Sequence, residues 1–305
     1  MNSRILTSLF LVCAFMISAS SCAQLKASKN YVTKDVHVGN FNKIELLNSA
    51  DVTYTQSNDG QSRVQIYGSD NLVEFMDISV NNGNLIIKFK KNTRISSWKD
   101  ARLKVIASSP SLEAVNLRGS GDLYLESNIN CDNFSILLQG SGDIDAKGAI
   151  HAKNVSFDLQ GSGDLKAMSV TASSVRTHLQ GSGDLKIHGP NKITSLDANL
   201  SGSGDLYLAN VTANDVKAQL QGSGDLRISG TTRTATLALQ ASGDLDAKNL
   251  QAVNVTATLN GSGDLNCHVT GTLKAGVNGS GDIGYKGNPS RVELIGGRAK
   301  NIRKL

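Results

Sequence analysis

The sequence of 305 residues has few of the side chains that fill the interior of a bulky globular domain. It contains seven Phe, six Tyr and one Trp, together with only three Pro, whereas Gly occurs 30 times. Abundant glycine with few aromatic residues favours short strands joined by tight turns. We therefore expect a chain built from stacked strands.

A single long apolar run occurs, close to the N-terminus, where it follows Arg4 and ends in small residues before Cys22. This pattern predicts a secretory signal peptide over residues 1–22, since the run is too short to span a bilayer. Two interpretations of its cleavage remain open: lipidation of Cys22, as at a bacterial lipobox, or ordinary cleavage after residues 21–23. We expect the lipidated form, with residues 23–30 as a tether to the membrane.

Clustered charge and catalytic signatures are also absent from the sequence. The formal net charge is +5 and basic residues are interspersed with acidic ones, which argues against nucleic-acid binding. The five histidines lack the spacing of metal ligands, and the sequence has neither a phosphate-binding loop nor a Gly-x-Ser-x-Gly elbow. Because the charged positions recur regularly and form no unique cluster, we expect that the protein is not an enzyme.

What the sequence does contain is a repeated tetrapeptide, Gly-Ser-Gly-Asp. It occurs nine times at intervals of 18 to 21 residues, once with Ala241 in place of the first glycine, and an aliphatic residue follows every copy. Internal repeats of this length indicate a solenoid, because one copy cannot bury its apolar face alone. The nine aspartates are Asp122, Asp143, Asp164, Asp184, Asp205, Asp225, Asp244, Asp264 and Asp282.

Apolar and polar residues alternate on both sides of the tetrapeptide. Val155, Phe157 and Leu159 precede one copy, and Leu165 and Ala167 follow it. Alternation with a period of two indicates strands, and three strands of three to five residues account for one repeat. The sequence therefore predicts an all-β chain that forms a parallel β-helix of about nine coils of ~20 residues, stacked about 4.8 Å apart.

The tetrapeptide is interpreted as the corner that every coil turns. Its second glycine is present in all nine copies, so we expect this position to need a positive φ, whereas the first glycine need only be small. The aspartate is expected to accept hydrogen bonds from nearby backbone N–H groups. An amide side chain stands four residues before seven of the nine aspartates, and we expect these amides to form hydrogen bonds from coil to coil. These amides are Gln139, Gln160, Gln180, Gln221, Gln240, Asn260 and Asn278.

The stacking also bears on the two cysteines beyond the signal peptide, Cys131 and Cys267. They lie six or seven coils apart, which corresponds to roughly 30 Å along the axis. A disulfide requires Cα atoms within about 7 Å of each other. We therefore expect both thiols to be unpaired.

Stacked corners place the nine aspartates in one column, here called the aspartate ladder. Neighbouring carboxylates in water at this spacing repel each other by about 0.9 kcal/mol. A structural role is our preferred interpretation, with a solvated corner and carboxylates that accept backbone hydrogen bonds. Weak cation binding, with Ca²⁺ as the candidate, is the alternative, although one aspartate per coil supplies few of the six to eight oxygens that Ca²⁺ takes. No other cofactor or metal is expected.

A second column is predicted at the exposed position two residues after each aspartate. Its tyrosines and cations could receive a glycan or a polyanion, and a mixed solvated strand face is the structural alternative. Trp98 lies in a predicted loop over residues 92–100, where it could stack on a sugar ring or pack locally. The candidate ligand residues of the column are Tyr124, Lys166, Lys186, Tyr207 and Arg227.

The N-terminal part departs from the period. Residues 48–52 align with Gly-Ser-Gly-Asp-Leu and start the pattern at Asp51, and Asn82-Gly83 between two alternating runs predicts a β-hairpin. Residues 102–108 read as a further strand. After the signal peptide and the tether, the expected organisation is a β-rich head with the first coils over 31–110, β-helix repeats over 111–290, and a C-terminal cap over 291–305 that covers the open edge.

The chain resembles a known family over roughly residues 30 to 290. The resemblance lies in FNKIELLNSADVTYTQ (41–56), in NLVEFMDISVNNGNLIIKFKK (71–91) and in the Gly-Ser-Gly-Asp series. These are similar to the "putative autotransporter adhesin, head GIN domain" family of exported bacterial proteins, common in Bacteroidetes. The resemblance implies a β-helical fold and a cell-envelope location, often as a lipoprotein, and it supplies no catalytic residues.

Three hypotheses of function follow. We expect an exported, non-enzymatic envelope protein, attached to the outer membrane by a lipid on its periplasmic or surface face, that presents a binding surface to a glycan or protein partner. A ligand-free spacer or scaffold of the periplasm or outer membrane is the alternative. A carbohydrate-active β-helix enzyme would need an asymmetric cleft with clustered carboxylates. No particular oligomeric state is indicated.

Overall fold

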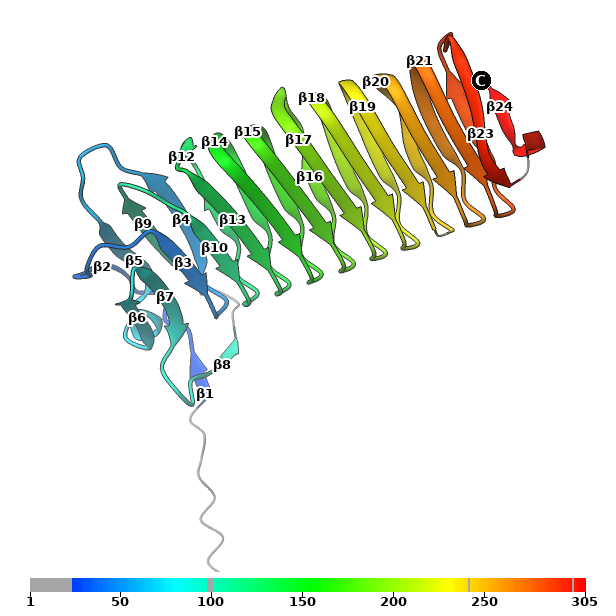
Figure 1. Cartoon of the computed structure of the whole chain (residues 1–305). Coiled ribbons are helices and arrows are strands. Elements are labelled where there is room, and N and C mark those ends of the chain that lie inside the picture. Colours follow the sequence, from blue (N-terminus) through cyan, green and yellow to red (C-terminus); the bar gives the residue numbers. More distant parts are fainter. Residues whose placement is uncertain (1–23, 98–100, 241, 298) are drawn as a thin grey trace, which may run out of the picture.

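The computed structural model describes residues 24–97, 101–240, 242–297 and 299–305. Within these ranges the chain forms a 22-stranded sheet and a separate 2-stranded sheet. The large sheet winds into a long solenoid with an N-terminal head at one end, as Figure 1 shows. The predicted all-β parallel β-helix is therefore confirmed. Cys22, Trp98 and Ala241 lie outside the described residues.

The coils of the solenoid pair in parallel with their neighbours along its whole length. Leu165 lies beside Ile144 of the preceding coil and Leu185 of the next. The first coils are formed by β3 (Lys43–Leu46), β4 (Asp51–Gln56), β10 (Ala114–Leu117), β11 (Leu123–Leu125), β12 (Ile129–Asn130) and β13 (Asn133–Leu138). The later coils are formed by β14 (Ile144–Leu159), β15 (Leu165–Leu179), β16 (Leu185–Ile187), β17 (Asn191–Leu200), β18 (Leu206–Leu220), β19 (Leu226–Leu239), β20 (Leu245–Leu259), β21 (Leu265–Val277) and β22 (Ile283–Lys286).

The division of each coil into three short strands was wrong. In most of the regular coils the strand runs without a break from one tetrapeptide to the next, over 16 residues in β14 and 15 in β15. At the bends within a coil the strand stays paired with the neighbouring coil, because the register of the pairing shifts there, as between Ala146 and Ala149. Only the Gly-Ser-Gly-Asp corner interrupts the hydrogen-bonded strand regularly.

The core is a set of aliphatic columns inside the coils. Leu165, Val175 and Leu179 of β15 are at most 1% exposed, and each stacks on an aliphatic residue of the preceding coil. Aliphatic side chains fill a flat coil at one-strand spacing, so large aromatic rings are needed at few places. Phe134 and Phe157 occupy neighbouring coils of this interior.

Cys131 and Cys267 are both free thiols, which confirms the prediction that they are unpaired. Cys267 lies in an inward column beside Ala247 and is 1% exposed. Burial raises the pKa of its thiol to about 12. The residue therefore acts as a small apolar side chain of the core.

The head is continuous with the solenoid. Strands β2 (Tyr31–Val36), β5 (Arg63–Ser69) and β9 (Leu103–Ser109) pair antiparallel, and β9 pairs in parallel with β4 of the first coil. The predicted hairpin is confirmed in β6 (Met76–Asn81) and β7 (Asn84–Phe89), which pair antiparallel. Asn82 and Gly83 between them have φ of 49° and 75°, the conformation that such a two-residue turn needs.

The described part of the predicted loop over residues 92–100 contains a strand instead. Strand β8 (Arg94–Ser97) pairs in parallel with β1 (Gln24–Lys26), which belongs to the segment predicted as a tether. The two short strands satisfy each other's backbone groups, a long-range pairing that local composition does not reveal. Near β1, the single-turn helix α1 (Asp70–Val73) buries Leu72 and Val73.

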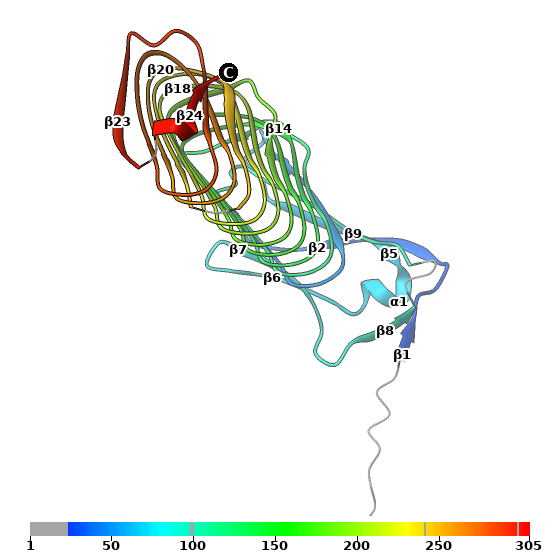
Figure 2. The same ribbon diagram turned by 90° about the vertical axis from the view of Figure 1, so that its right-hand side faces the viewer.

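The segment 291–305 lies on the last coil as one more turn. Strand β23 (Arg291–Gly297) pairs with β21, and β24 (Ile302–Lys304) pairs with β22. Figure 2 shows both strands at the end of the solenoid that faces the viewer. Val292 and Leu294 stand in line with the core residues Leu273 and Ala275, yet they are 44% and 56% exposed.

Candidate binding surface

The glycines of the corner are explained by close packing of successive coils, which corrects the prediction about φ. Among the described residues, the glycines with positive φ all lie outside the tetrapeptides. A Cβ atom on Gly163 would stand 2.0 Å from the carbonyl oxygen of Gly142, and one on Gly161 would stand 2.1 Å from that of Gly140. A side chain at either position would meet the backbone of the preceding coil, and a left-handed conformation is not involved.

The aspartates use their carboxylates between coils. Asp164 N–H donates to Asp143 Oδ1 at 2.8 Å, and Asp184 N–H donates to Asp164 Oδ1 at 3.0 Å. The same bond recurs from Asp51, in the degenerate first copy, to Asp282. Asn301 Nδ2 donates to Asp282 Oδ1 at 2.9 Å and ends the chain of bonds. The carboxylates thus accept backbone hydrogen bonds, as predicted, and the donors belong to the neighbouring coil.

Amides near the corner add a partial second chain. Gln139 Nε2 donates to Gln160 Oε1 at 2.8 Å, and Asn278 Nδ2 donates to Asn260 Oδ1 at 3.1 Å. The predicted bonds from coil to coil are confirmed at these two pairs. Gln160 Nε2 bonds the carboxylate of Asp158 in its own coil, so an acidic neighbour competes with the next amide.

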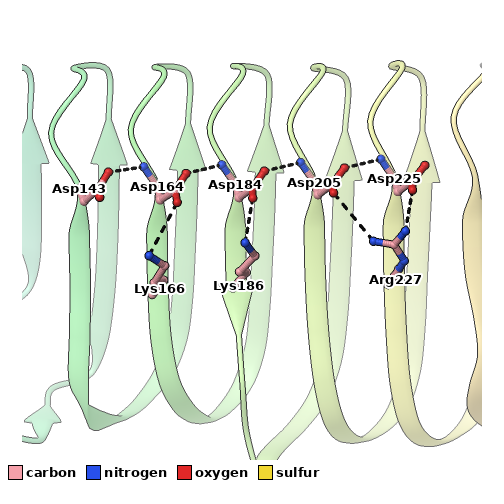
Figure 3. A network of polar contacts seen from close by, with 8 residues as sticks. All are labelled: Asp143, Asp164, Lys166, Asp184, Lys186, Asp205, Asp225 and Arg227. Atoms are coloured by element: carbon pink, nitrogen blue, oxygen red, sulfur yellow. Dashed lines mark hydrogen bonds and ion pairs between the residues drawn. The ribbon is translucent and has the colours of Figure 1, made fainter.

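The two predicted columns form one network, which Figure 3 shows for five coils. Lys186 Nζ lies 2.8 Å from Asp184 Oδ2, and Lys166 Nζ lies 3.7 Å from Asp164 Oδ2. Arg227 contacts the carboxylates of Asp225 at 2.7 Å and Asp205 at 3.8 Å. Residues two apart on a strand point to the same side, so each cation can reach the free oxygen of its own aspartate.

The ion pairs between cations and aspartates shift the pKa values of the side chains that form them. Burial raises the pKa of Asp184, but hydrogen bonds from Lys186 and from the N–H of Asp205 outweigh it and hold the pKa below its ordinary value. The hydrogen bond to Asp184 in turn raises the pKa of Lys186. Opposite charges therefore compensate the repulsion between carboxylates along the middle of the ladder.

The tyrosines of the column differ in their contacts. Tyr124 Oη donates to Asp122 Oδ2 at 3.1 Å, and Lys147 Nζ lies 5.0 Å from the centre of its ring. Burial together with the hydrogen bond to Asp122 raises the pKa of Tyr124 to about 12. Tyr207 is 37% exposed. The column therefore offers aromatic surface beside paired cations.

The same face extends onto the head, which sequence reasoning missed. Tyr124 pairs with Thr53, and Thr53 pairs with Ile106, which is 40% exposed. Further out, the rings of Tyr31 and Tyr67 lie 6.2 Å apart, and the Arg102 guanidinium is 5.2 Å from the Tyr31 ring centre. The 20-residue period stops before these residues, so the repeat gave no signal for them.

The carboxylates of the aspartate ladder suit a structural role better than metal binding. In each of the nine repeats Oδ1 accepts a hydrogen bond from the next coil or from Asn301, and three repeats also pair their aspartate with the cation two residues on. Over the ranges that the structure covers, there is no group of three or more His, Cys, Asp or Glu residues that could hold a metal ion.

Among the residues that the structure describes, no helix has the length and apolar character to cross a membrane.

A known family model matches most of the chain. Residues 40–191 and 179–289 match the model described as "Putative auto-transporter adhesin, head GIN domain". The chain belongs to this family. The description of the head GIN domain family as adhesins indicates, at a coarse level, a protein of the cell surface or envelope with a binding role rather than a catalytic one.

Solved structures show the same fold. A putative adhesin from Parabacteroides distasonis is 21% identical with a TM-score of 0.59, over 93% of this chain and 100% of that one. A putative adhesin from Parabacteroides merdae is 20% identical with a TM-score of 0.50, over 92% and 99%. A putative lipid binding protein from Parabacteroides distasonis is 21% identical with a TM-score of 0.50, over 93% and 100%. Comparison with curated proteins gave no match.

Proposed function

We propose that this head GIN domain protein is an exported, non-enzymatic binding protein of the cell envelope that presents one long solenoid face to a glycan or protein partner. The observation that carries the proposal is the unbroken register of outward residues from Gln65 and Ile106 through Tyr124 to Arg227. Aromatic and charged side chains held at one-strand spacing suit a repetitive or extended partner.

A spacer without a ligand is the second candidate, and one observation favours it. Lys166, Lys186 and Arg227 are engaged by the aspartate ladder, so part of their charge serves the solenoid itself. The exposed surfaces of Tyr207 and Ile106 have no such internal role, and they favour the binding protein.

Alanine substitution across the column tests the choice. We expect binding of the purified protein to immobilised glycans and to envelope fractions to fall at least about tenfold, because the variant removes the aromatic and cationic contacts of the face. The substituted residues are Tyr124, Lys166, Lys186 and Tyr207. A matched control replaces four residues that are exposed elsewhere on the coils: Met168, Lys192, Lys217 and Arg233. Equal binding by wild type and column variant, with the fold intact by circular dichroism, would support the spacer.

We also propose that the protein is tethered to the outer membrane through a lipid on Cys22. The support is the apolar run and the small residues that precede this cysteine. Cells that express the wild-type chain are expected to incorporate labelled palmitate into it, and globomycin is expected to leave the labelled chain uncleaved. The Cys22→Ala variant is expected to lose the label entirely. Absence of label from the wild type would indicate ordinary cleavage, and label that persists in the variant would contradict lipidation at Cys22.

A further inference from the structure

A groove of about 600 Å³ lies across β10, β13, β14 and β15. These strand segments precede the Gly-Ser-Gly-Asp corner, whereas Tyr124 and the rest of the column follow it. Figure 1 shows β10 and β13 side by side next to the head. The groove is therefore a separate feature from the face described above.

One row of residues shapes the groove along the solenoid axis. Lys43 pairs with Ala114, which is followed in register by Ser135, Ser156 and Arg176 of the next coils. Three small side chains form the floor, and a long cation stands at each end. The side chain of Arg176 is 69% exposed, with Asp197 at 3.8 Å, and Lys43 is also exposed.

Polar groups line the flank of the groove. Asn154 Nδ2 donates to Asn133 Oδ1 at 2.8 Å, which fixes both amides in one row. An amide carries two N–H donors and an oxygen with two lone pairs, so each of these side chains keeps hydrogen-bonding capacity beyond that bond. Glu113 adds an acceptor to the lining. Alternating donors and acceptors of this kind match hydroxyl groups.

The length of the row suggests the form of the ligand. Four strand spacings separate Lys43 from Arg176, which corresponds to about 19 Å. One pyranose ring of an extended oligosaccharide chain is similar in length to one coil spacing. A peptide strand is disfavoured, because β10, β13 and β14 already pair on both sides and leave no backbone edge in the groove.

We propose that this groove binds an acidic oligosaccharide, with sugar rings over Ser135 and Ser156 and acidic groups near Lys43 and Arg176. The choice of a glycan rests on the proposed function, which it deepens by naming a second site and a ligand class. The carboxylate of Glu113 accepts from sugar hydroxyls, and the two cations select the charge.

Filling the groove is the first test. Wild-type protein and the Ser135→Trp/Ser156→Trp variant are titrated with uronate, sialylated and sulfated oligosaccharides of increasing length, and with a methyl-esterified uronate as the neutral counterpart. We expect at least one acidic oligosaccharide to bind, the neutral ester to bind at least about tenfold more weakly, and the variant to lose about tenfold or more in affinity. Thr236→Trp is the control, since Thr236 continues the same row three coils beyond Arg176.

Two further variants avoid added bulk in case the tryptophans disturb folding. Asn154→Asp keeps the shape of an exposed side chain but adds a negative charge, and Lys43→Gln with Arg176→Gln removes both cations. Each is expected to weaken binding about tenfold and the second to flatten its dependence on salt. The proposal is overturned if no acidic oligosaccharide of the panel binds the wild type, or if binding survives all three groove variants.

The column variant, with Tyr124, Lys166, Lys186 and Tyr207 replaced, is measured in parallel. Loss of envelope or glycan binding in the column variant alone would overturn the groove and leave the proposed function standing. Loss in the groove variants alone would support the groove and move the binding surface away from the column. A wild type that binds no glycan and no envelope fraction would contradict both proposals.

Discussion

Replacement of Gly183 by alanine is expected to destabilise the solenoid by about 3 kcal/mol, at the upper end of the cost of overpacking. The new Cβ would stand 2.0 Å from the carbonyl oxygen of Gly163 and 2.7 Å from its carbonyl carbon. Those atoms belong to the backbone of the preceding coil and have no rotamer that relieves the overlap. Only a separation of the two coils could make room, and it would weaken the strand pairing on both sides of the corner. Urea unfolding followed by circular dichroism measures the change.

Ser182→Ala is the matched control for this prediction. Ser182 is exposed at the same corner, and the bond from its N–H to Gly161 O at 3.1 Å involves only backbone. Its substitution is expected to change the free energy of unfolding by no more than about 0.5 kcal/mol. The second glycine of the motif is chosen because all nine copies retain it, whereas the first is once replaced by Ala241. Equal stabilities of the two variants would contradict the close-packing explanation.

The second large effect is expected from Asp184→Ala, with a loss of about 2 kcal/mol. The substitution leaves the N–H of Asp205 without its acceptor at 2.9 Å and deprives Lys186 of a partner at 2.8 Å. Asp184→Asn keeps a side-chain oxygen for that N–H, so it is expected to lose less than half as much. Unfolding curves of the two variants separate the hydrogen bond from the charge. A deficit in the asparagine variant as large as in the alanine variant would refute the hydrogen-bond account.

The pH dependence of stability follows from the same pair. The pKa of Asp184 is lower in the folded protein than its ordinary value of 3.8, so its contribution is complete above that value and is lost as the pH falls through the folded pKa. The pKa of Lys186 is raised above 10.5, so its contribution is complete below 10.5 and is lost as the pH rises through the folded pKa. Both side chains are about one-third exposed, and salt is expected to weaken the effect. Asp184→Ala should therefore be less sensitive to acid than the wild type.

Much of the fold could be predicted because the same pattern of residues recurs in every repeat. Alternation on both sides of the tetrapeptide fixes which residues face inward, and stacking at a constant interval fixes their neighbours. Even the degenerate copy at residues 48–52 was aligned correctly, since Val52 pairs with Leu123 and Asp51 accepts from Asp122 N–H. The hairpin at Asn82-Gly83 was predictable because few residues tolerate two successive positive φ values.

The remaining features depend on contacts between residues far apart in the sequence. The space beside Gly163 is set by the backbone of Gly142, which a turn propensity does not describe. The pairing of β8 with β1 joins two segments with no repeat in common. Within the repeats, the pairing of Lys186 with Asp184 could have been found, because residues two apart on a strand share a side. The groove also had a signal, namely small residues in the register between Lys43 and Arg176.

The hydrogen bonds between successive aspartates have a consequence for the size of the molecule. Each coil accepts from the following one and donates to the preceding one with the same two groups, so every interior unit is interchangeable in this respect. Gain or loss of one complete unit would leave all remaining carboxylates with a donor. Descendants of such a gene can lengthen or shorten the rod in increments of about 4.8 Å, and so adjust its reach while both ends stay the same.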